Sequence, residues 1–246
     1  MPTLSVIIPT FNEEAFIEDA LYSVQFADEI IVIDSFSTDQ TVEIVKRYEV
    51  KLLQRKFDNF SNQKNHALKE ASGDWILFVD ADERIPYALQ KEILKTLKNP
   101  KHAAYKIRFP HFYMNRFLKY HSDSVIRLVK REGAEFSGKV HEKLSFSGNS
   151  VGKFKNPMLH FTYKGLHHYI TKKESYAWFQ AEQLYEKNKK TNWFHLGFKP
   201  FYRFYSSYIL KGGFRDGIPG LTVAVVNAYG VFQRYVKLML LHRDMR

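Results

Sequence analysis

Hydrophobic residues in the first hundred positions form two alternating patterns, short continuous runs and longer stretches with helical spacing. The short runs are rich in β-branched residues and end at polar residues, which indicates strands buried on both faces. These expected strands cover residues 4–9, 29–34, 50–55 and 74–80.

The stretches between these runs carry apolar residues every three or four positions, as on one face of a helix. These expected helices cover residues 13–24, 40–48, 60–71 and 87–97. Asn12 is expected to cap the first helix, and Thr38 or Asp39 the second. Strands that alternate with helices in this way predict a mostly parallel sheet in an α/β layer fold.

The pattern changes after residue 103. Residues 103–114 and 124–131 are expected to form strands, and residues 134–146 have turn and strand character. From about residue 166 the chain is helical, with a break at "KGGFRDGIPG" (211–220). We therefore expect an α/β domain over residues 1–165 and a helical extension over residues 166–246.

Charge and aromatic residues distinguish the two parts. Residues 1–150 hold 21 basic and 21 acidic residues, which leaves 16 of the 37 basic and 5 of the 26 acidic residues for 151–246. The same segment holds 20 of the 39 aromatic residues, so an anionic partner is expected there. The absence of cysteine excludes disulfides and thiolate metal sites and suits a reducing cytosol. The first residues, MPTLSVIIPT, lack a basic leader and are expected to form a strand.

Acidic residues follow the expected strands at their carboxyl ends, where parallel sheets bind ligands. Asp34 ends the second strand, and Asp80 and Asp82 end the fourth. Carboxylate oxygens suit Mg²⁺ or Mn²⁺, which bind phosphates with their remaining positions. The ordinary alternative is an acidic loop that opens the next helix and interacts with its dipole.

These residues lie within four stretches that, in the same order, resemble the inverting family-two glycosyltransferases of the GT-A fold. The stretches are "SVIIPTFNEE" (5–14), "EIIVIDSFSTDQT" (29–41), "NQKNHAL" (62–68) and "WILFVDADER" (75–84). Two further stretches, "FSGKVHEKL" (136–144) and "GGFRDGIPG" (212–220), are similar to the subgroup that adds sugars to lipopolysaccharide core, including beta-glucosyltransferases. The resemblance implies a GT-A domain over residues 1–165 that moves a hexose, with glucose expected, from a UDP-sugar to a hydroxyl of a cell-envelope glycan.

The resemblance also implies residue roles at the strand ends. The loop after the first strand would surround the nucleotide base and ribose, and Asp34 would hydrogen-bond the uracil. Lys64 would reach the diphosphate or the uridine, Asp80 the ribose or the metal, and Asp82 the metal. The implied nucleotide-binding residues are Pro9, Thr10, Phe11, Asn12, Glu13, Asp34, Asp39, Lys64, Asp80 and Ala81.

Inverting transfer needs a carboxylate that takes the proton of the acceptor hydroxyl. Many family members carry it in a Glu-Asp pair, and this chain has no such pair after residue 83. Glu142 is therefore the expected catalytic base and Asp123 the alternative. A surface ion pair with Lys139 or Lys143 is the ordinary explanation for Glu142.

Other residues have weaker implied roles. His160 stands where related enzymes place a metal-binding histidine, which would complete the metal set Asp80, Asp82 and His160, although a lone histidine is more often structural. The expected acceptor-binding residues are His141, Arg127, Lys172 and Tyr176.

The aromatic residues of the extension are interleaved with basic residues, which is typical of a segment lying on an anionic membrane. We expect it to place the enzyme on the inner face of the cytoplasmic membrane, near a lipid-linked acceptor. A polyprenyl-phosphate or other lipid-linked sugar transferase of the same fold is the nearest alternative. A nucleotidyltransferase would need a glycine-rich loop where "PTFNEE" stands, and a nucleic-acid-binding module would leave the strand-end acids unexplained.

Overall fold

The computed structural model describes residues 2–138, 142–161 and 165–245. The chain divides into two compact units, Met1–Phe109 with Asp123–His160 and Pro110–Ser122 with Phe161–Arg246. Each unit has its own buried apolar clusters.

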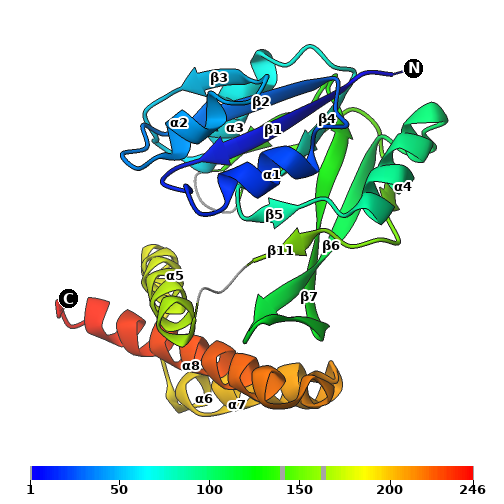
Figure 1. Cartoon of the computed structure of the whole chain (residues 1–246). Helices are drawn as coiled ribbons and strands as arrows, with labels where there is room; N and C mark the ends of the chain where they lie inside the picture. The colour runs from blue at the N-terminus through cyan, green and yellow to red at the C-terminus, as the bar shows by residue number, and fades with distance from the viewer. Residues whose placement is uncertain (1, 139–141, 162–164, 246) are drawn as a thin grey trace. The chain divides into compact units, whose positions relative to one another are not determined.

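The first unit contains four parallel strands, confirming the α/β prediction (Figure 1). Strand β1 (Leu4–Thr10) lies between β2 (Glu29–Asp34) and β4 (Trp75–Phe78), and β3 (Lys51–Gln54) lies beyond β2. The apolar runs of β1, β2 and β4 are buried on both sheet faces, whereas β3 is only partly buried. Because Thr10 pairs with Asp34, the ends of β1 and β2 bring their loops to one edge.

The helices of this unit follow the predicted order, and the first two begin later than predicted, at Ile17 and Thr41. They are α1 (Ile17–Ser23), α2 (Thr41–Val45), α3 (Phe60–Lys69) and α4 (Tyr87–Lys98). The prediction that Asn12 caps the first helix was wrong. Asn12 has a positive φ of 53°, and its side-chain oxygen accepts the backbone N–H of Thr38 at 2.8 Å, so it joins two loops instead.

A mixed region continues the sheet on the other side of β4. Strand β7 (Arg116–Lys130) pairs antiparallel with β4 and neighbours β6 (Ala104–Tyr113). Strand β10 (Val151–Lys153) pairs with β6, and the short β11 (Leu159–His160) pairs with β5 (Glu83–Arg84). The hairpin β8 (Glu135–Ser137) and β9 (Lys143–Ser145) lies apart from this sheet. The short β5–β11 pairing places His160 opposite Glu83, close to the end of β4.

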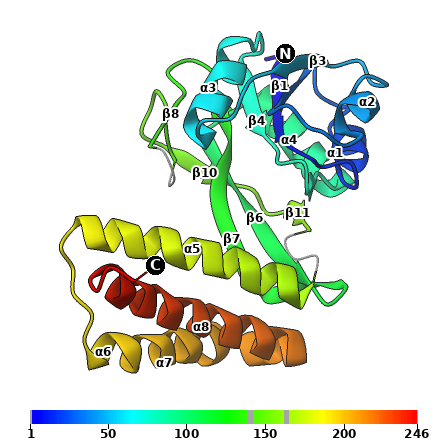
Figure 2. The same cartoon turned by 90° about the vertical axis from the view of Figure 1, so that its left-hand side faces the viewer.

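The second unit is the predicted helical extension together with the tip of the β6–β7 hairpin. Its elements are α5 (Leu166–Glu186), α6 (Trp193–Leu196), α7 (Phe198–Tyr205), a π-helical turn (Ser206–Leu210), a 3₁₀ turn (Gly213–Asp216) and α8 (Gly217–Leu241). Helix α8 packs against both α5 and α7 and lies between them (Figure 2). Within the described residues, no helix combines the length and apolar character that crossing a bilayer requires.

The predicted break before α8 is a close-packed joint. Gly212 has a φ of +74°, which favours glycine. A Cβ on Gly220 would overlap the carbonyl oxygen of Gly213, so the first turn of α8 approaches the 3₁₀ turn as only glycine allows.

A buried polar network ties the hairpin tip to this joint. The Asp216 carboxylate accepts the backbone N–H groups of Lys119 at 2.8 Å and Tyr120 at 3.0 Å. It also lies 3.1 Å from Nδ1 of His121, whose Nε2 lies 3.1 Å from Oγ of Ser207. Asp216, His121 and Ser207 are 4%, 7% and 5% exposed. The hairpin tip and the helices therefore share one hydrogen-bonded core.

Candidate active site

The loops after β1 and β2 are joined by side-chain hydrogen bonds. Asp34 is fully buried and accepts Ser37 N–H at 3.0 Å and Gln54 Nε2 at 3.2 Å. The backbone N–H of Asn12 donates to Ser37 Oγ at 2.8 Å. These hydrogen bonds hold the two loops together at the sheet edge where the sequence predicts a bound nucleotide. The hydrogen bond expected between Asp34 and a uracil stays a prediction.

Asp39 and Glu13 hold the same edge from the α2 side. The backbone N–H of Glu13 donates to Thr41 Oγ1 at 2.8 Å, and Asp39 accepts the Thr41 backbone N–H at 3.0 Å. Burial would raise the pKa of Asp39, but its hydrogen bonds with Thr41 outweigh this and lower it. Asp39 thus has a structural role at the start of α2, beside its predicted one.

Residues at the end of β1 offer contacts to a ligand. The Thr10 hydroxyl oxygen is buried and has no hydrogen-bond partner among the described residues, while the neighbouring Phe11 is 55% exposed. Pro9, which precedes them in β1, is partly buried. A buried, unsatisfied hydroxyl beside an exposed ring fits a site that is completed by a ligand.

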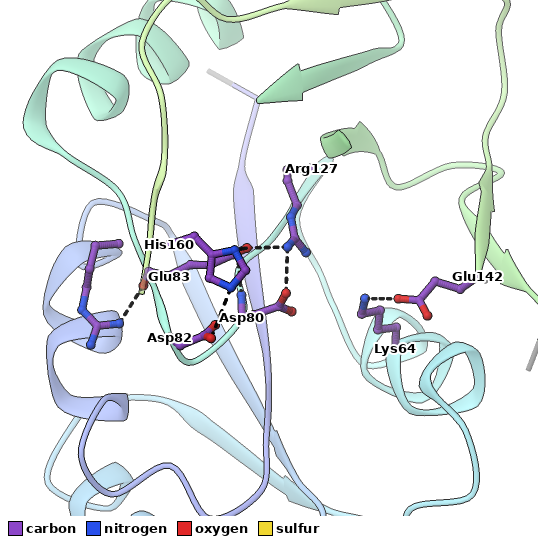
Figure 3. A network of polar contacts seen from close by, with 8 residues as sticks. Lys64, Asp80, Asp82, Glu83, Arg127, Glu142 and His160 are labelled. Atoms are coloured by element: carbon purple, nitrogen blue, oxygen red, sulfur yellow. Dashed lines mark hydrogen bonds and ion pairs between the residues drawn. The ribbon is translucent and has the colours of Figure 1, made fainter. Parts of the chain in front are cut away.

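An arginine and two carboxylates form the centre of the site (Figure 3). Nη2 of Arg127, from β7, lies 2.7 Å from Oδ2 of Asp80 and 2.5 Å from Oε1 of Glu83. The backbone N–H of Asp80 donates to Glu83 Oε2 at 2.9 Å. Glu83 has no solvent exposure, so Arg127 is the charge that makes this buried acid tolerable.

The pKa values of Glu83 and Asp80 shift in opposite directions. Burial raises the pKa of Glu83 to about 7, with Arg127 opposing and Asp80 adding to the shift. Burial would also raise the pKa of Asp80, but Arg127 and Lys64 outweigh it and hold that pKa well below its usual range. Asp80 is therefore ionised at neutral pH.

Asp82, on the loop after β4, and His160, at the end of β11, form a second pair (Figure 3). His160 Nε2 lies 3.2 Å from Asp82 Oδ2. Burial would lower the pKa of His160, but Asp82 and the nearby acids raise it overall. No group of three or more such side chains is arranged to hold a metal within the described ranges. The donor types nevertheless fit Mg²⁺ or Mn²⁺, because Asp82 lies beside His160 and Asp80 belongs to the same loop as Asp82.

Lys64 and Glu142 approach the same region from α3 and from the start of β9. Lys64 Nζ, which is almost fully buried, lies 2.5 Å from Glu142 Oε1 and 5.1 Å from the centre of the Phe136 ring. A cavity of about 550 Å³ is lined by Lys64, Asp80, Arg127 and Glu142. The ion pair predicted for Glu142 on the surface is instead made with a buried lysine inside this cavity.

Two other residues expected at the site, Asp123 and Ala81, are not among the described residues that line this cavity. Asp123 is exposed and is not among the residues lining this cavity, whereas its neighbour Ser124 is. Ala81 is buried, and its carbonyl accepts a hydrogen bond from Arg84 at 2.8 Å. His141 lies outside the described residues.

Of the two acceptor-binding residues expected on α5, only Tyr176 lines the pocket that this helix forms in the second unit. Lys173 lines the same pocket, and Lys172 is not among the residues that line it. The acceptor role of Lys172 and Tyr176 stays a prediction.

The sequence analysis did not single out Glu83. It follows Asp80 and Asp82 in "DADER", where an acid before a helix has the ordinary explanation of favouring the helix dipole. Its burial and its pairing with Arg127, 44 residues away, are the features that mark it as part of the site.

Known proteins resemble this chain over most of its length. The family model described as "Glycosyl transferase family 2" matches residues 5–174, more than two thirds of the chain. The lipopolysaccharide core biosynthesis glycosyltransferase LpsC of Rhizobium meliloti is 27% identical over 252 residues, which cover 97% of this chain and 93% of LpsC.

Solved structures support the fold. The mannosyltransferase PcManGT of Pyrobaculum calidifontis, in complex with GDP-Man and Mn²⁺, matches 97% of this chain and 87% of its own, with a TM-score of 0.62 and 17% identity. Residues 1–349 of Staphylococcus aureus TarS, in complex with UDP-GlcNAc, match 99% of this chain and 92% of that chain, with a TM-score of 0.53 and 17% identity. In a longer TarS structure, this chain spans 46% of the length. At these identities the likeness establishes the fold.

Proposed function

Because the chain belongs to glycosyl transferase family 2, we propose that it moves a hexose from a UDP-sugar to a hydroxyl of lipopolysaccharide core or a similar envelope glycan, inverting the anomeric carbon. One observation carries this proposal. The cavity at the carboxyl edge of the sheet is lined by Asp80, Lys64, Arg127 and Glu142, and Asp82, on the same loop as Asp80, lies 3.2 Å from His160 of β11.

Each of these residues is proposed to have a separate role in the reaction. Asp82, with His160 and Asp80, would hold a divalent ion, which as a Lewis acid stabilises the departing diphosphate. Lys64 and Arg127 add fixed positive charge beside the same group. The acceptor oxygen bonds to the anomeric carbon as the carbon–diphosphate bond breaks, and its proton passes to Glu142. UDP leaves, and the acceptor carries the sugar.

The two structural relatives support a nucleotide-sugar donor, since one holds UDP-GlcNAc and the other GDP-Man with Mn²⁺. A donor screen tests the choice. The melting temperature is expected to rise more with UDP-glucose than with GDP- or dTDP-sugars, and more with Mn²⁺ than with EDTA, because ligands that bind the folded state stabilise it. Equal shifts for all donors, or none, would contradict the proposal.

The acceptor class rests on a different comparison. LpsC, which is named for lipopolysaccharide core biosynthesis, aligns over nearly the whole length of both chains, including the helical extension. The extension is therefore proposed to serve the acceptor side of the reaction.

We also propose that the extension docks on an anionic membrane surface. Large apolar side chains are exposed on α6, α7 and the first turn of α8, including Trp193 (88%), Phe201 (64%) and Ile218 (72%). Arg203, Lys211 and Arg215 are interleaved with them along the chain. Rings at the headgroup level with cations around them describe an interfacial segment, each base contributing roughly 1 kcal/mol near the surface.

Vesicle flotation tests this docking. The chain is expected to float with phosphatidylglycerol vesicles at low salt, to bind phosphatidylcholine vesicles weakly, and to dissociate as salt rises, because salt screens the charge attraction. A chain that stays at the bottom of the gradient with anionic vesicles at low salt would end the proposal.

A further inference from the structure

A second pocket lies wholly within the helical extension, and none of the residues assigned to catalysis is among those that line it. We call it the extension pocket. Its floor is α8, its walls are α5 and α7, and its volume is about 610 Å³. The lining includes Lys173 and Tyr176 from α5, Lys199, Tyr202 and Arg203 from α7, and Asn227, Gly230, Arg234 and Tyr235 from α8.

Charge is the unusual feature of this pocket. Four of its lining side chains are cationic, and none of the described residues that line it is acidic. Glu174, which follows Lys173 on α5, lies 3.3 Å from Lys237. Like charges gathered around one hollow repel one another unless an anion lies between them.

The cations are held in place by their surroundings. Lys199 Nζ donates to the Tyr235 hydroxyl at 2.7 Å and lies 4.8 Å from the centre of its ring. Nε of Arg234 is buried and has no hydrogen-bond partner among the described residues. Burial lowers the pKa of Arg234, and the nearby Arg203 adds to this shift while Tyr235 opposes it. Nε of Arg234 is thus a buried donor that the described residues of the pocket do not satisfy.

We propose that the extension pocket binds a phosphate mono- or diester, with Arg203 and Arg234 contacting the phosphoryl oxygens and Lys173 and Lys199 completing the positive surround. Guanidinium groups match phosphate geometry and form charge-assisted hydrogen bonds to it. The volume exceeds that of a phosphate alone, so Tyr176 and Tyr202 would contact the glycerol or sugar attached to it. A phosphorylated glycan and a phospholipid headgroup present the same chemistry.

Titration of the full chain with sn-glycerol 3-phosphate in EDTA, followed by calorimetry, tests this site. The double variant Arg203→Gln/Arg234→Gln is expected to bind at least about tenfold more weakly than the original chain. The double variant Lys187→Gln/Lys190→Gln removes the same charge from exposed positions outside the pocket and should bind as the original does. Equal affinity in all three proteins, or equal loss in both variants, would overturn the proposal.

A variant that fills the pocket without changing its charge distinguishes binding inside the pocket from attraction to the general positive charge of the extension. A Cβ on Gly230 would lie 3.7 Å from Lys173 Cβ, an ordinary contact, so Gly230→Leu should fold with all four cations kept. Its side chain would fill the floor of the pocket, and we expect a similar loss of glycerol phosphate binding. Full affinity in Gly230→Leu would overturn the assignment to this pocket. UDP binding at the sheet edge, unchanged in every variant, serves as the check of folding.

Experiments with phosphatidylglycerol vesicles distinguish a phospholipid headgroup from a phosphorylated glycan as the ligand of the pocket. Release of the chain from vesicles by glycerol phosphate, together with weaker flotation of Arg203→Gln/Arg234→Gln than of Lys187→Gln/Lys190→Gln, would support the pocket and assign it a lipid headgroup. Loss of glycerol phosphate binding with equal flotation of both variants would support the pocket and assign it a phosphorylated glycan.

Discussion

Replacement of Asp82 by alanine is expected to lower sugar transfer at least about a thousandfold, because a Lewis acid at a departing diphosphate contributes several kcal/mol and each 1.36 kcal/mol is a factor of ten in rate. Asp82 is the acid that faces His160, and its other neighbours on the loop, Asp80 and Glu83, are already engaged with Arg127. Removing it should also abolish the strengthening of UDP binding by Mn²⁺, which calorimetry measures directly.

The fold should survive this change. Asp82 is not fully buried, and its loss leaves only a partly exposed histidine without that partner. Glu43→Ala is the matched control, since it removes an exposed acid whose ion pair with Lys46 contributes little. Asp82→Ala should show a melting temperature close to that of the control. Metal-dependent transfer that persists in Asp82→Ala would refute the metal assignment.

Replacement of Glu142 by glutamine is expected to lower kcat at least about a hundredfold, which is the range lost when a general base is removed. Glutamine keeps the size and a hydrogen-bond acceptor for Lys64 but cannot take the acceptor's proton. The affinity for UDP should change little, so the effect should appear in kcat and not in donor binding.

Asp123→Asn is the comparison for this experiment because Asp123 is the alternative base. It is exposed and not among the residues lining the cavity that holds Glu142, so its replacement should leave kcat near that of the original chain. The opposite pattern, with an active Glu142→Gln and an inactive Asp123→Asn, would transfer the role to Asp123.

The strands could be predicted from the sequence because their signal is local. Four apolar runs with polar ends are enough to specify buried parallel strands, and the order of the elements then places their carboxyl ends at one edge. The position of Asp80 and Asp82 at a strand end could be predicted for the same reason, and His160 was suggested by resemblance. Their role as metal ligands stays a prediction.

The remaining contacts depend on residues far apart in the chain. Arg127 was considered for the acceptor, but its role as the partner of buried Glu83 depends on the antiparallel placement of β7 beside β4. Asn12 was expected to cap a helix because its own neighbours suggest it, whereas Thr38, in another loop, supplies its actual donor. On α5, spacing alone paired Tyr176 with Lys172, and only the packing against α8 shows that Lys173 shares its pocket.

Ser207, His121 and Asp216 reproduce, atom for atom, the chain of contacts that hydrolases use to activate a serine nucleophile. Their burial gives a different outcome. Asp216 already accepts two backbone amides, and the serine hydroxyl lies inside the helical core, where its oxygen has no open path to a carbonyl substrate. A search of structures for esterases by triad geometry alone would therefore select this sugar transferase in error, and a requirement for an accessible serine would remove it.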